Sequence, residues 1–332
     1  MTNDEIKKAM KDKFKGIRFP RDIDFIGDEK NITVELKYEL IKKHNMQVAG
    51  NAFEGWAIAI HMVFSDMIVR LSVDLYPDAG LMKGHWARFI YRAMKFSEQY
   101  EWFRVSEELA SIIKTFKTDL DEKVLVNNIP TQDAKCIGED IEAGLESEVE
   151  DKLARRGILH SYLPSYVGID QEIHRQLPVG LFEINDNMEK IGKKNAWFTY
   201  GHSAIDLWNI NGDAINVIEL KARNRMIGIV TEIFFYTNFV YDFVMNKKTT
   251  GFIMSDIPEG VNENELRGYS ELYKSKGKIR KVNGIMLVDD DNYHPCVTKD
   301  ILVILNDNGK GDLNYFRESY HLGIVLGKYS RF

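Results

Sequence analysis

The fold is decided by one stretch of the sequence, Ser203-Ala-Ile-Asp-Leu-Trp-Asn-Ile-Asn-Gly-Asp-Ala-Ile-Asn-Val-Ile-Glu-Leu-Lys221. Asn211-Gly212 stands between two apolar runs. This dipeptide is the strongest short signal for a β-hairpin, because both of its residues tolerate a positive φ. A two-residue loop at Asn211-Gly212 predicts that Ile210 pairs with Asp213, and the stretch is therefore expected to form two antiparallel strands.

Three charged side chains share one face of the expected hairpin. In this register Asp206 is opposite Val217 and on the same face as Glu219 and Lys221, because successive side chains of a strand alternate between faces. Asp206 is then diagonal to Glu219, at roughly 7–8 Å between backbones, so the two carboxylates can converge on one ion. Such groups are costly to bury unless they pair or bind metal, and carboxylate oxygens suit Mg²⁺.

Asp206 followed by Glu219-Leu220-Lys221 resembles the motif of the PD-(D/E)XK nuclease superfamily, which has the restriction-endonuclease-like fold. The resemblance covers residues 139–250. It implies that Asp206, Glu219 and the carbonyl oxygen of Leu220 bind Mg²⁺ (or Mn²⁺), while Lys221 orients the attacking water. The proline that names the motif is absent, which lowers the specificity of the match without removing a ligand.

Two flanking helices extend the resemblance. The acidic segment around Glu146 resembles the first helix of the family, which often adds an acidic ligand; Glu146 is the first candidate and Glu150 the second, with a solvated acidic face as the alternative. Glu232 is the only charged residue of the apolar segment 227–241. A lone acid there would have a raised pKa unless something compensates it. The resemblance implies that Glu232 faces the active site, one turn before Tyr236.

Residues beside the motif are candidates for contacts with nucleic acid. Arg223 and Arg225 follow Lys221 closely, and phosphate contacts dominate nucleic-acid affinity. Gln176 lies on the expected first strand, where related sequences often carry a polar residue near the site. Exposed arginines and polar residues of edge strands are nevertheless common, so each of these three positions also has a plain surface interpretation.

The bulk charge argues against a protein that coats nucleic acid nonspecifically. The chain has 332 residues, with 44 Lys and Arg against 50 Asp and Glu, and a net charge of −6. Positive charge is clustered locally, most densely in the segment 274–281, for which a solvated loop is the commoner interpretation and a phosphate track the alternative. An enzyme that contacts phosphates locally is compatible with this distribution.

The expected fold class is α/β, with a mixed sheet flanked by helices and a mainly helical N-terminal region. We expect that region to span residues 1–135 and the nuclease-like domain to span 136–332, with its catalytic core at 139–250. The N-terminal region would supply target recognition, dimerisation or partner binding, and its aromatic residues are interpreted first as a helical core. A homodimer is expected.

A cytoplasmic, non-membrane protein is expected. No apolar run approaches the roughly 20 residues needed to cross a bilayer, and the N-terminus lacks the apolar core of a secretory signal. Cys136 and Cys296 are too few for a disulfide framework. His61 is interpreted as a core or interface histidine, and His294 with Cys296 lacks the matching pair that a zinc site requires.

An N-terminal copy of the motif pattern also occurs. Asp24, Glu35 and Lys37 fall on one face if the chain turns at Asp28-Glu29. Asp-Glu is a poorer turn pair than Asn-Gly, too few residues precede Asp24 for the acidic helix and first strand, and no lone acid in an apolar helix follows closely. We therefore interpret this copy as a structural hairpin or a mixed strand–helix segment.

The predicted function is a metal-dependent nuclease that hydrolyses phosphodiester bonds. The resemblance implies DNA rather than RNA as substrate, in restriction, repair or defence against foreign DNA. The alternative is a non-catalytic module that binds nucleic acid or protein on the same fold, and a third hypothesis is a sensor whose helical part gates the nuclease. The sequence has neither a phosphate-binding Gly-Lys-Ser/Thr loop nor a Gly-x-Ser-x-Gly elbow, which disfavours nucleotide and serine hydrolases.

Overall fold

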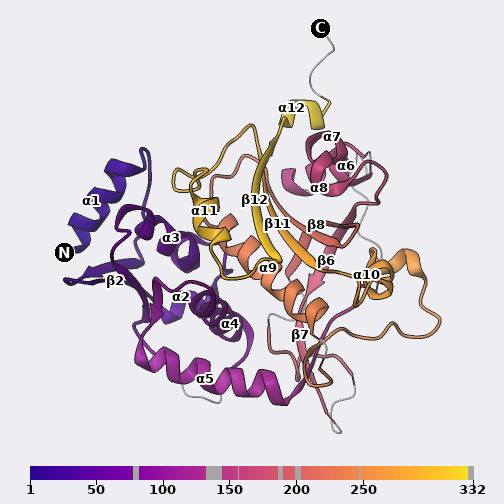
Figure 1. The fold of residues 1–332 in the computed structure, drawn as a ribbon, viewed down its shortest axis with the longest axis horizontal. Helices are drawn as coiled ribbons and strands as arrows, with labels where there is room; N and C mark the ends of the chain where they lie inside the picture. Colours follow the sequence, from indigo (N-terminus) through magenta and orange to yellow (C-terminus); the bar gives the residue numbers. More distant parts are fainter. Residues whose placement is uncertain are drawn as a thin grey trace.

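The computed structural model describes residues 1–77, 82–131, 144–155, 157–185, 190–198, 203–246 and 248–327. These residues form mixed sheets flanked by helices, as expected for the α/β class (Figure 1). The expected boundary near residue 135 and Cys136 lie outside the described residues. In the described part of the chain, no helix is long and apolar enough to span a membrane.

The N-terminal region contains a four-stranded sheet that the expectation of a mainly helical region missed. Its strands, in spatial order, are β1 (Ile23–Gly27), β2 (Asn31–Leu36), β3 (Ile68–Val73) and β4 (Phe103–Val105). The first pair is antiparallel and the others are parallel. Helices surround this sheet: α1 (Asn3–Lys13), α2 (Tyr38–Lys43), α3 (Phe53–Val63), α4 (Gly84–Gln99) and α5 (Glu107–Glu122).

A five-stranded mixed sheet forms the centre of the C-terminal region. Its spatial order is β12 (Leu313–Tyr320), β11 (Lys281–Asp289), β9 (Ala214–Lys221), β8 (Ser203–Asn211) and β6 (His174–Val179). The β8 strand is antiparallel to both of its neighbours, β6 and β9, whereas β9, β11 and β12 run parallel. A mixed sheet was expected, and β6 is one of its edges.

Helices cover both faces of this sheet. On one face α6 (Leu145–Arg155), α7 (Leu159–Tyr162) and α8 (Pro164–Val167) pack on Leu207, Ile218 and Leu220. On the other face α9 (Gly228–Met245) packs on Trp208 and Val217. The remaining helical segments are η1 (Ala49–Asn51), η3 (Glu263–Leu266), α10 (Tyr269–Lys274), α11 (Ile301–Asn306) and α12 (Leu322–Val325).

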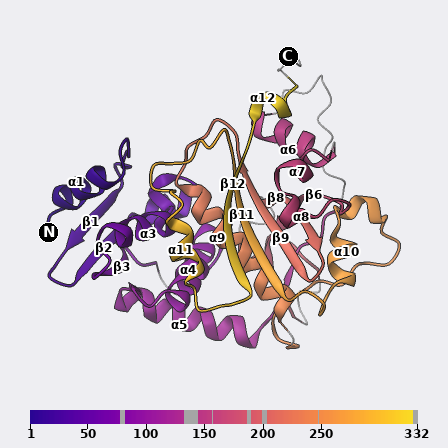
Figure 2. The ribbon, with the colours of Figure 1, turned by 45° about the horizontal axis from the view of Figure 1, so that its top comes forward.

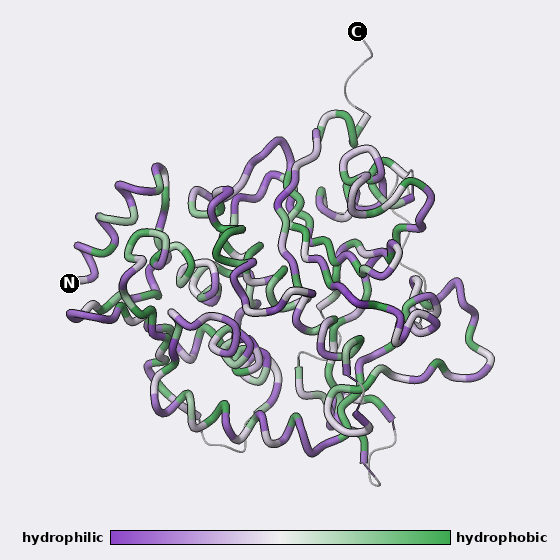
Figure 3. The backbone as a smooth tube through the Cα atoms, viewed as in Figure 1, coloured by the Kyte–Doolittle hydropathy of each residue, from purple (hydrophilic) through white to green (hydrophobic). Residues whose placement is uncertain are grey.

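The apolar helix α9 lies between the C-terminal sheet and the N-terminal helices α3 and α4 (Figures 1 and 2). This position explains why α9 is apolar nearly all round, since a helix that contacts protein on every side has no polar face. Gly228 permits the close approach, because a Cβ atom there would lie 2.0 Å from the carbonyl oxygen of Gln47. Hydrophobic residues accordingly run through the central strands and helices (Figure 3).

A small third sheet joins the two regions. Its order is β10 (Gly251–Ile253), β5 (Val124–Asn127) and β7 (Leu181–Ile184). The central strand β5 follows α5 of the N-terminal region, while both of its neighbours come from later in the chain. The N-terminal and C-terminal regions therefore share backbone hydrogen bonds.

Candidate active site

The hairpin that carries the motif forms, but its register differs by two residues from the expected one. Asn211 pairs with Ala214, and Leu207 pairs with Ile218, so the loop is Gly212-Asp213. Gly212 has a φ of 64°, which suits the first central position of a tight hairpin loop. Asn211 stays in the strand, where its side-chain amide donates to the carbonyl oxygen of Tyr166 at 2.8 Å.

This register brings Asp206 level with Glu219 and not with Val217. A shift of two residues preserves the alternation of faces, so Asp206, Glu219 and Lys221 still share the face of the sheet that α9 covers. The backbone N–H of Leu220 donates to Oδ2 of Asp206 at 2.9 Å, which holds this carboxylate against β9. The expected diagonal relationship was wrong, and the correct one brings the two carboxylates closer together.

Lys221 is held between two buried carboxylates. Its Nζ atom lies 2.6 Å from Oε1 of Glu219 on the same strand and 3.0 Å from Oε2 of Glu232 on α9. The three side chains are at most 5 % exposed. Burial lowers the pKa of Lys221. The negative charges of four carboxylates have the larger, opposite effect and raise this pKa well above its ordinary value: Glu219, Glu232, Asp206 and Glu146. Lys221 is therefore an ammonium ion, and its charge compensates that of Glu232.

Asp206 and Glu219 are destabilised as anions. The pKa of Asp206 is raised to about 8, mainly by burial, and the charges of Glu150 and Glu232 also raise it. The charge of Lys221 and the hydrogen bond from the Leu220 N–H lower this pKa but do not offset the increase. Burial and the charge of Asp206 raise the pKa of Glu219 well above its ordinary value. Oε2 of Glu219 is buried and has no hydrogen-bond partner within the described part of the chain. A bound cation would relieve both the repulsion and the missing contact.

The helix α6 brings the two expected acids to the site in different ways. Oε1 of Glu146 accepts from the backbone N–H of Ala222 at 3.3 Å, directly after Lys221. Glu150 is instead paired with Arg175, at 2.9 Å from Nε, and with the amide of Gln176 at 2.6 Å. Glu146 thus lies beside the end of β9 with one oxygen bound to the backbone, whereas both oxygens of Glu150 have partners.

Gln176 occupies an unusual backbone conformation beside Asp206. The pairs on both sides of Gln176 bring it level with Asp206 on β8, and its φ of 54° is positive. Residues other than glycine rarely adopt this region, and such strain clusters at functional sites. Arg267 holds the conformation by donating from Nη1 to the Gln176 carbonyl oxygen at 2.8 Å.

Arg223 and Arg225 are exposed at the end of β9. The backbone N–H of Arg223 donates to Oδ1 of Asp289 at 2.8 Å, and Nε of Arg225 donates to the carbonyl oxygen of Tyr293 at 3.1 Å. The two residues are therefore anchored on the end of β11 and on the loop that follows it. Their contact with nucleic acid stays a prediction.

Sequence reasoning missed an arginine that the N-terminal region contributes. Arg88 on α4 is 2 % exposed and donates to Oγ of Ser203 at 2.8 Å and to Oδ1 of Asn45 at 2.9 Å. Burial lowers the pKa of Arg88 to about 10, while Tyr236 and Glu232 act in the opposite direction. Its charge thus reaches the expected Glu232–Tyr236 pair. The only available signal was the spacing of Arg88 and Arg92 by four residues in an apolar helix.

The N-terminal copy of the pattern forms a hairpin, as interpreted, and its charges also meet. Asp24 pairs directly with Glu35, and Nζ of Lys37 lies 3.8, 3.5 and 3.8 Å from the carboxylates of Asp24, Glu35 and Asp74. These side chains are 30–43 % exposed, so water screens their interactions. The acid on the following helix α3, Glu54, is instead bound by Arg92 at 2.6 Å. Burial thus distinguishes the two copies.

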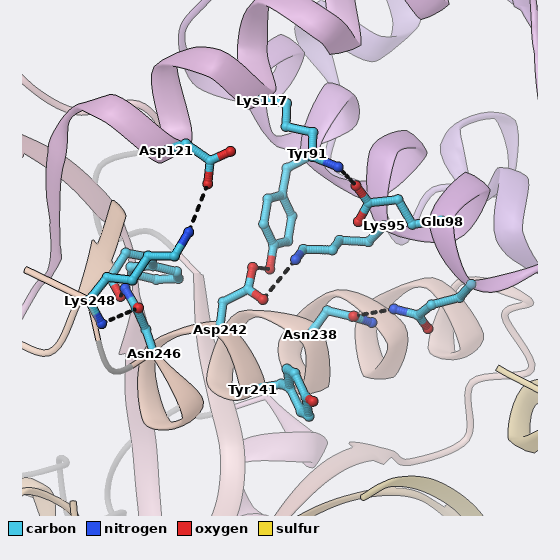
Figure 4. A network of polar contacts seen from close by, with 12 residues as sticks. Tyr91, Lys95, Glu98, Lys117, Asp121, Asn238, Tyr241, Asp242, Asn246 and Lys248 are labelled. Atoms are coloured by element: carbon cyan, nitrogen blue, oxygen red, sulfur yellow. Dashed lines mark hydrogen bonds and ion pairs between the residues drawn. The ribbon is translucent and has the colours of Figure 1, made fainter. Parts of the chain in front are cut away.

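A second charged cluster lies where α4, α5 and α9 meet (Figure 4). Asp242 accepts from Nζ of Lys95 at 2.7 Å and from the hydroxyl of Tyr91 at 2.8 Å, while Lys117 pairs with Glu98 at 2.6 Å. The cluster borders a cavity of about 410 Å³. Since cation and carboxylate balance in these pairs, the arrangement is that of a structural clamp between the two regions.

The histidine and cysteine candidates offer no catalytic arrangement. The ring of His61 stacks on Trp102 with 4.2 Å between centroids, as an interface histidine would. Cys296 is buried, and burial lowers the pKa of His294 to about 4. Among the residues that the structure describes, no three His, Cys, Asp or Glu side chains are grouped as a ready-made metal centre.

Comparisons with known proteins add no family assignment. No protein-family model, no curated protein and no solved structure matches the chain. The interpretation of the site therefore depends on its own geometry.

Proposed function

We propose that the protein is a metal-dependent hydrolase of phosphodiester bonds, of the PD-(D/E)XK type. The observation that carries the proposal is the cluster of the half-buried Asp206 with the buried Glu219, Lys221 and Glu232. A lysine and three carboxylates gathered on one sheet face are costly to bury, and a catalytic role accounts for that cost. The order of acidic helix, first strand, hairpin and apolar helix along the chain also supports the resemblance.

The donor set fits a divalent cation. In the hairpin register Asp206 is level with Glu219, and among the described residues Oε2 of Glu219 is buried without a hydrogen-bond partner. Carboxylate oxygens are the ligands that Mg²⁺ and Mn²⁺ prefer, so Asp206 and Glu219 would hold the ion, with Glu146 and the carbonyl oxygen of Leu220 as further ligands. When bound, the ion supplies Lewis acidity and lowers the pKa of a bound water.

The remaining residues orient and compensate charge. The ammonium of Lys221 would hold the attacking water and stabilise the negative charge that develops on the phosphate oxygens. Glu232 and Glu219 fix the position of that ammonium. Glu150 and Gln176 brace the edge of the site beside Asp206, and Arg223 with Arg225 would contact phosphates next to the scissile bond.

The proposed substrate is DNA in preference to RNA, cut in restriction, repair or defence by a cytoplasmic homodimer. A polyanionic substrate fits exposed arginines at the exit of the catalytic strand. The rival hypothesis is a module on the same fold that binds nucleic acid or protein without turnover. The sensor hypothesis would add gating by the N-terminal region, from which Arg88 reaches the site.

Cleavage assays test the proposal directly. The protein is incubated with plasmid, linear DNA and RNA, with Mg²⁺, with Mn²⁺ and with chelator, beside Asp206→Asn and Lys221→Ala. Cleavage that needs the cation and is lost in both variants is expected. The matched control is Asp24→Asn, which changes the exposed copy of the motif and should retain full activity. Cleavage that persists in both site variants would overturn the assignment of the active site to Asp206 and Lys221. Binding without cleavage on every substrate would favour the non-catalytic binding module.

A further inference from the structure

Five exposed cations run from the last residue of α10 through the connector to the first residue of β11, and we call them the basic ridge: Lys274, Lys276, Lys278, Arg280 and Lys281. Lys274 pairs with Glu263 at 3.1 Å. Throughout the described residues, the other four cations of the ridge form no ion pair. An uncompensated group of cations is notable in a chain whose net charge is −6.

The backbone of the basic ridge is well anchored. The N–H groups of Arg280 and Lys281 donate to the carbonyl oxygen of Asp213 at 2.7 and 3.2 Å, which ties the ridge to the loop of the catalytic hairpin. Ile279 between them is buried. The ridge therefore presents charged side chains from a fixed main chain, which lowers the entropy cost of binding a ligand.

The ridge separates two cavities and presents cations to both. Lys274 and Lys278 line a cavity of about 1080 Å³, while Lys276 and Arg280 line another of about 650 Å³. The positive φ of Gly277, 81°, turns the chain between them. Because cations line both cavities, they suit an anionic ligand long enough to cross the ridge from one cavity to the other.

The larger cavity borders β6, the edge strand of the sheet that carries the candidate active site. Its wall includes His174 and Arg175 on β6 and Arg267, the residue that holds the Gln176 carbonyl oxygen. Gln176 in turn is level with Asp206. Both views of the ribbon show α10 beside β6 (Figures 1 and 2). A long anion lying over the ridge would thus reach the edge of the site.

We propose that the basic ridge binds the phosphate backbone of a nucleic acid and guides the strand toward Asp206. This inference rests on the proposed function and adds a binding track remote from the metal ligands. The chemistry is that of sequence-independent phosphate contact, because lysine and arginine side chains form it without base recognition. A lipid surface fits less well, since the apolar residue of the ridge, Ile279, is buried and leaves nothing to insert between acyl chains.

The test compares two quadruple variants that remove the same charge. The ridge variant is Lys276→Gln, Lys278→Gln, Arg280→Gln and Lys281→Gln, and the control variant is Lys8→Gln, Lys11→Gln, Lys13→Gln and Lys15→Gln, which neutralises exposed lysines at the N-terminus. Binding to a short fluorescent DNA duplex is measured by anisotropy in EDTA at several salt concentrations. Thermal melts verify that both variants are folded.

Log affinity falls with log salt, and each lost phosphate contact lowers the magnitude of this slope by about 0.9 on duplex DNA. We therefore expect the magnitude to decrease by about 3 to 4 for the ridge variant and not to change for the control. With Mg²⁺ present, the ridge variant should cut with a raised KM and a kcat close to that of the wild type. An unchanged slope overturns the ridge while cleavage by the wild type still supports the proposed function. If binding depends on the ridge but no substrate is cleaved, the result contradicts the proposed nuclease activity and supports the proposed DNA-binding role of the ridge. Loss of binding to phosphatidylserine vesicles, with DNA affinity unchanged, would reassign the ridge to membranes.

Discussion

Oε2 of Glu232 on α9 lies 3.0 Å from the ammonium of Lys221 on β9, and both side chains are buried. This ion pair links α9 to β9. Glu219 holds the same ammonium from the strand itself. The lysine is thus fixed from two elements.

Glu232→Gln tests the positioning of Lys221. Glutamine can still accept a hydrogen bond from the ammonium but no longer compensates its charge. Loss of such a supporting partner commonly costs about 10- to 100-fold in activity, and we expect a decrease of that size in kcat for DNA cleavage. The exposed pair Lys117–Glu98 supplies the control, because Glu98→Gln should leave the rate unchanged. Full activity of Glu232→Gln would contradict the positioning role.

Lys221→Met should destabilise the protein as well as inactivate it. Removing one partner of a buried ionic cluster leaves charges unpaired and typically costs about 3–5 kcal/mol. Urea denaturation at neutral pH measures the free energy of unfolding. Adding Glu219→Gln and Glu232→Gln to this variant should restore most of the lost stability without restoring activity, and failure to do so would show that the side chain of Lys221 acts mainly through packing.

Asp206→Asn should stabilise the metal-free protein at alkaline pH. The folded protein raises the pKa of Asp206 from 3.8 to about 8, so ionisation opposes folding: the wild type loses stability between those values as the pH rises. Asparagine still accepts from the Leu220 N–H but carries no charge. Thermal melts in EDTA should show a higher Tm for the variant at pH 9 and a difference that shrinks toward pH 4. A constant difference across this range would contradict the assigned cause.

Mg²⁺ should stabilise the wild type through Asp206 and Glu219. A ligand at 100 times its dissociation constant adds about 2.7 kcal/mol to the stability of the folded state, which appears as an increase in Tm. We expect Glu219→Gln to lose this increase, because the orphan Oε2 becomes part of a neutral amide. Glu35→Gln on the exposed N-terminal hairpin is the matched control and should retain the full increase.

Gly228→Ala tests the packing of α9 on the N-terminal region. The new Cβ atom would lie 2.0 Å from the backbone oxygen of Gln47, and overpacking of this kind costs about 1–3 kcal/mol. Gly311→Ala is the control, because a Cβ atom there contacts nothing within 4 Å. Equal stability of the two variants, measured by urea denaturation, would show that the two regions separate at little cost.

The sequence predicted correctly which face of the sheet carries each charged residue, but it did not predict correctly which residue lies opposite it on the neighbouring strand. Alternation along β8 and β9 placed Asp206, Glu219 and Lys221 together, and this survived a register error of two residues because the error was even. The register itself depends on the amide of Asn211, which bonds to the distant Tyr166 and keeps Asn211 in the strand. No local pattern contains that contact.

The features that sequence reasoning missed depend on pairing between distant segments. β3 and β4 are short; β3 pairs in parallel with β2, and β4 pairs in parallel with β3, so their hydrogen-bond partners lie far along the chain. Arg88 reaches the site only because α4 packs beside α9. The positive φ of Gln176 likewise has no signal in its own residue type, since it is held by Arg267 from another segment.

The shared sheet of β10, β5 and β7 has a consequence for biosynthesis. When β5 leaves the ribosome, neither of the strands that will flank it has been made, and its second neighbour follows only after the whole of α9. Closing such long loops slows folding, so the N-terminal region should stay incompletely folded until translation passes Ile253. A chain truncated before β7 would expose both edges of β5, and we expect it to aggregate rather than form a stable fragment.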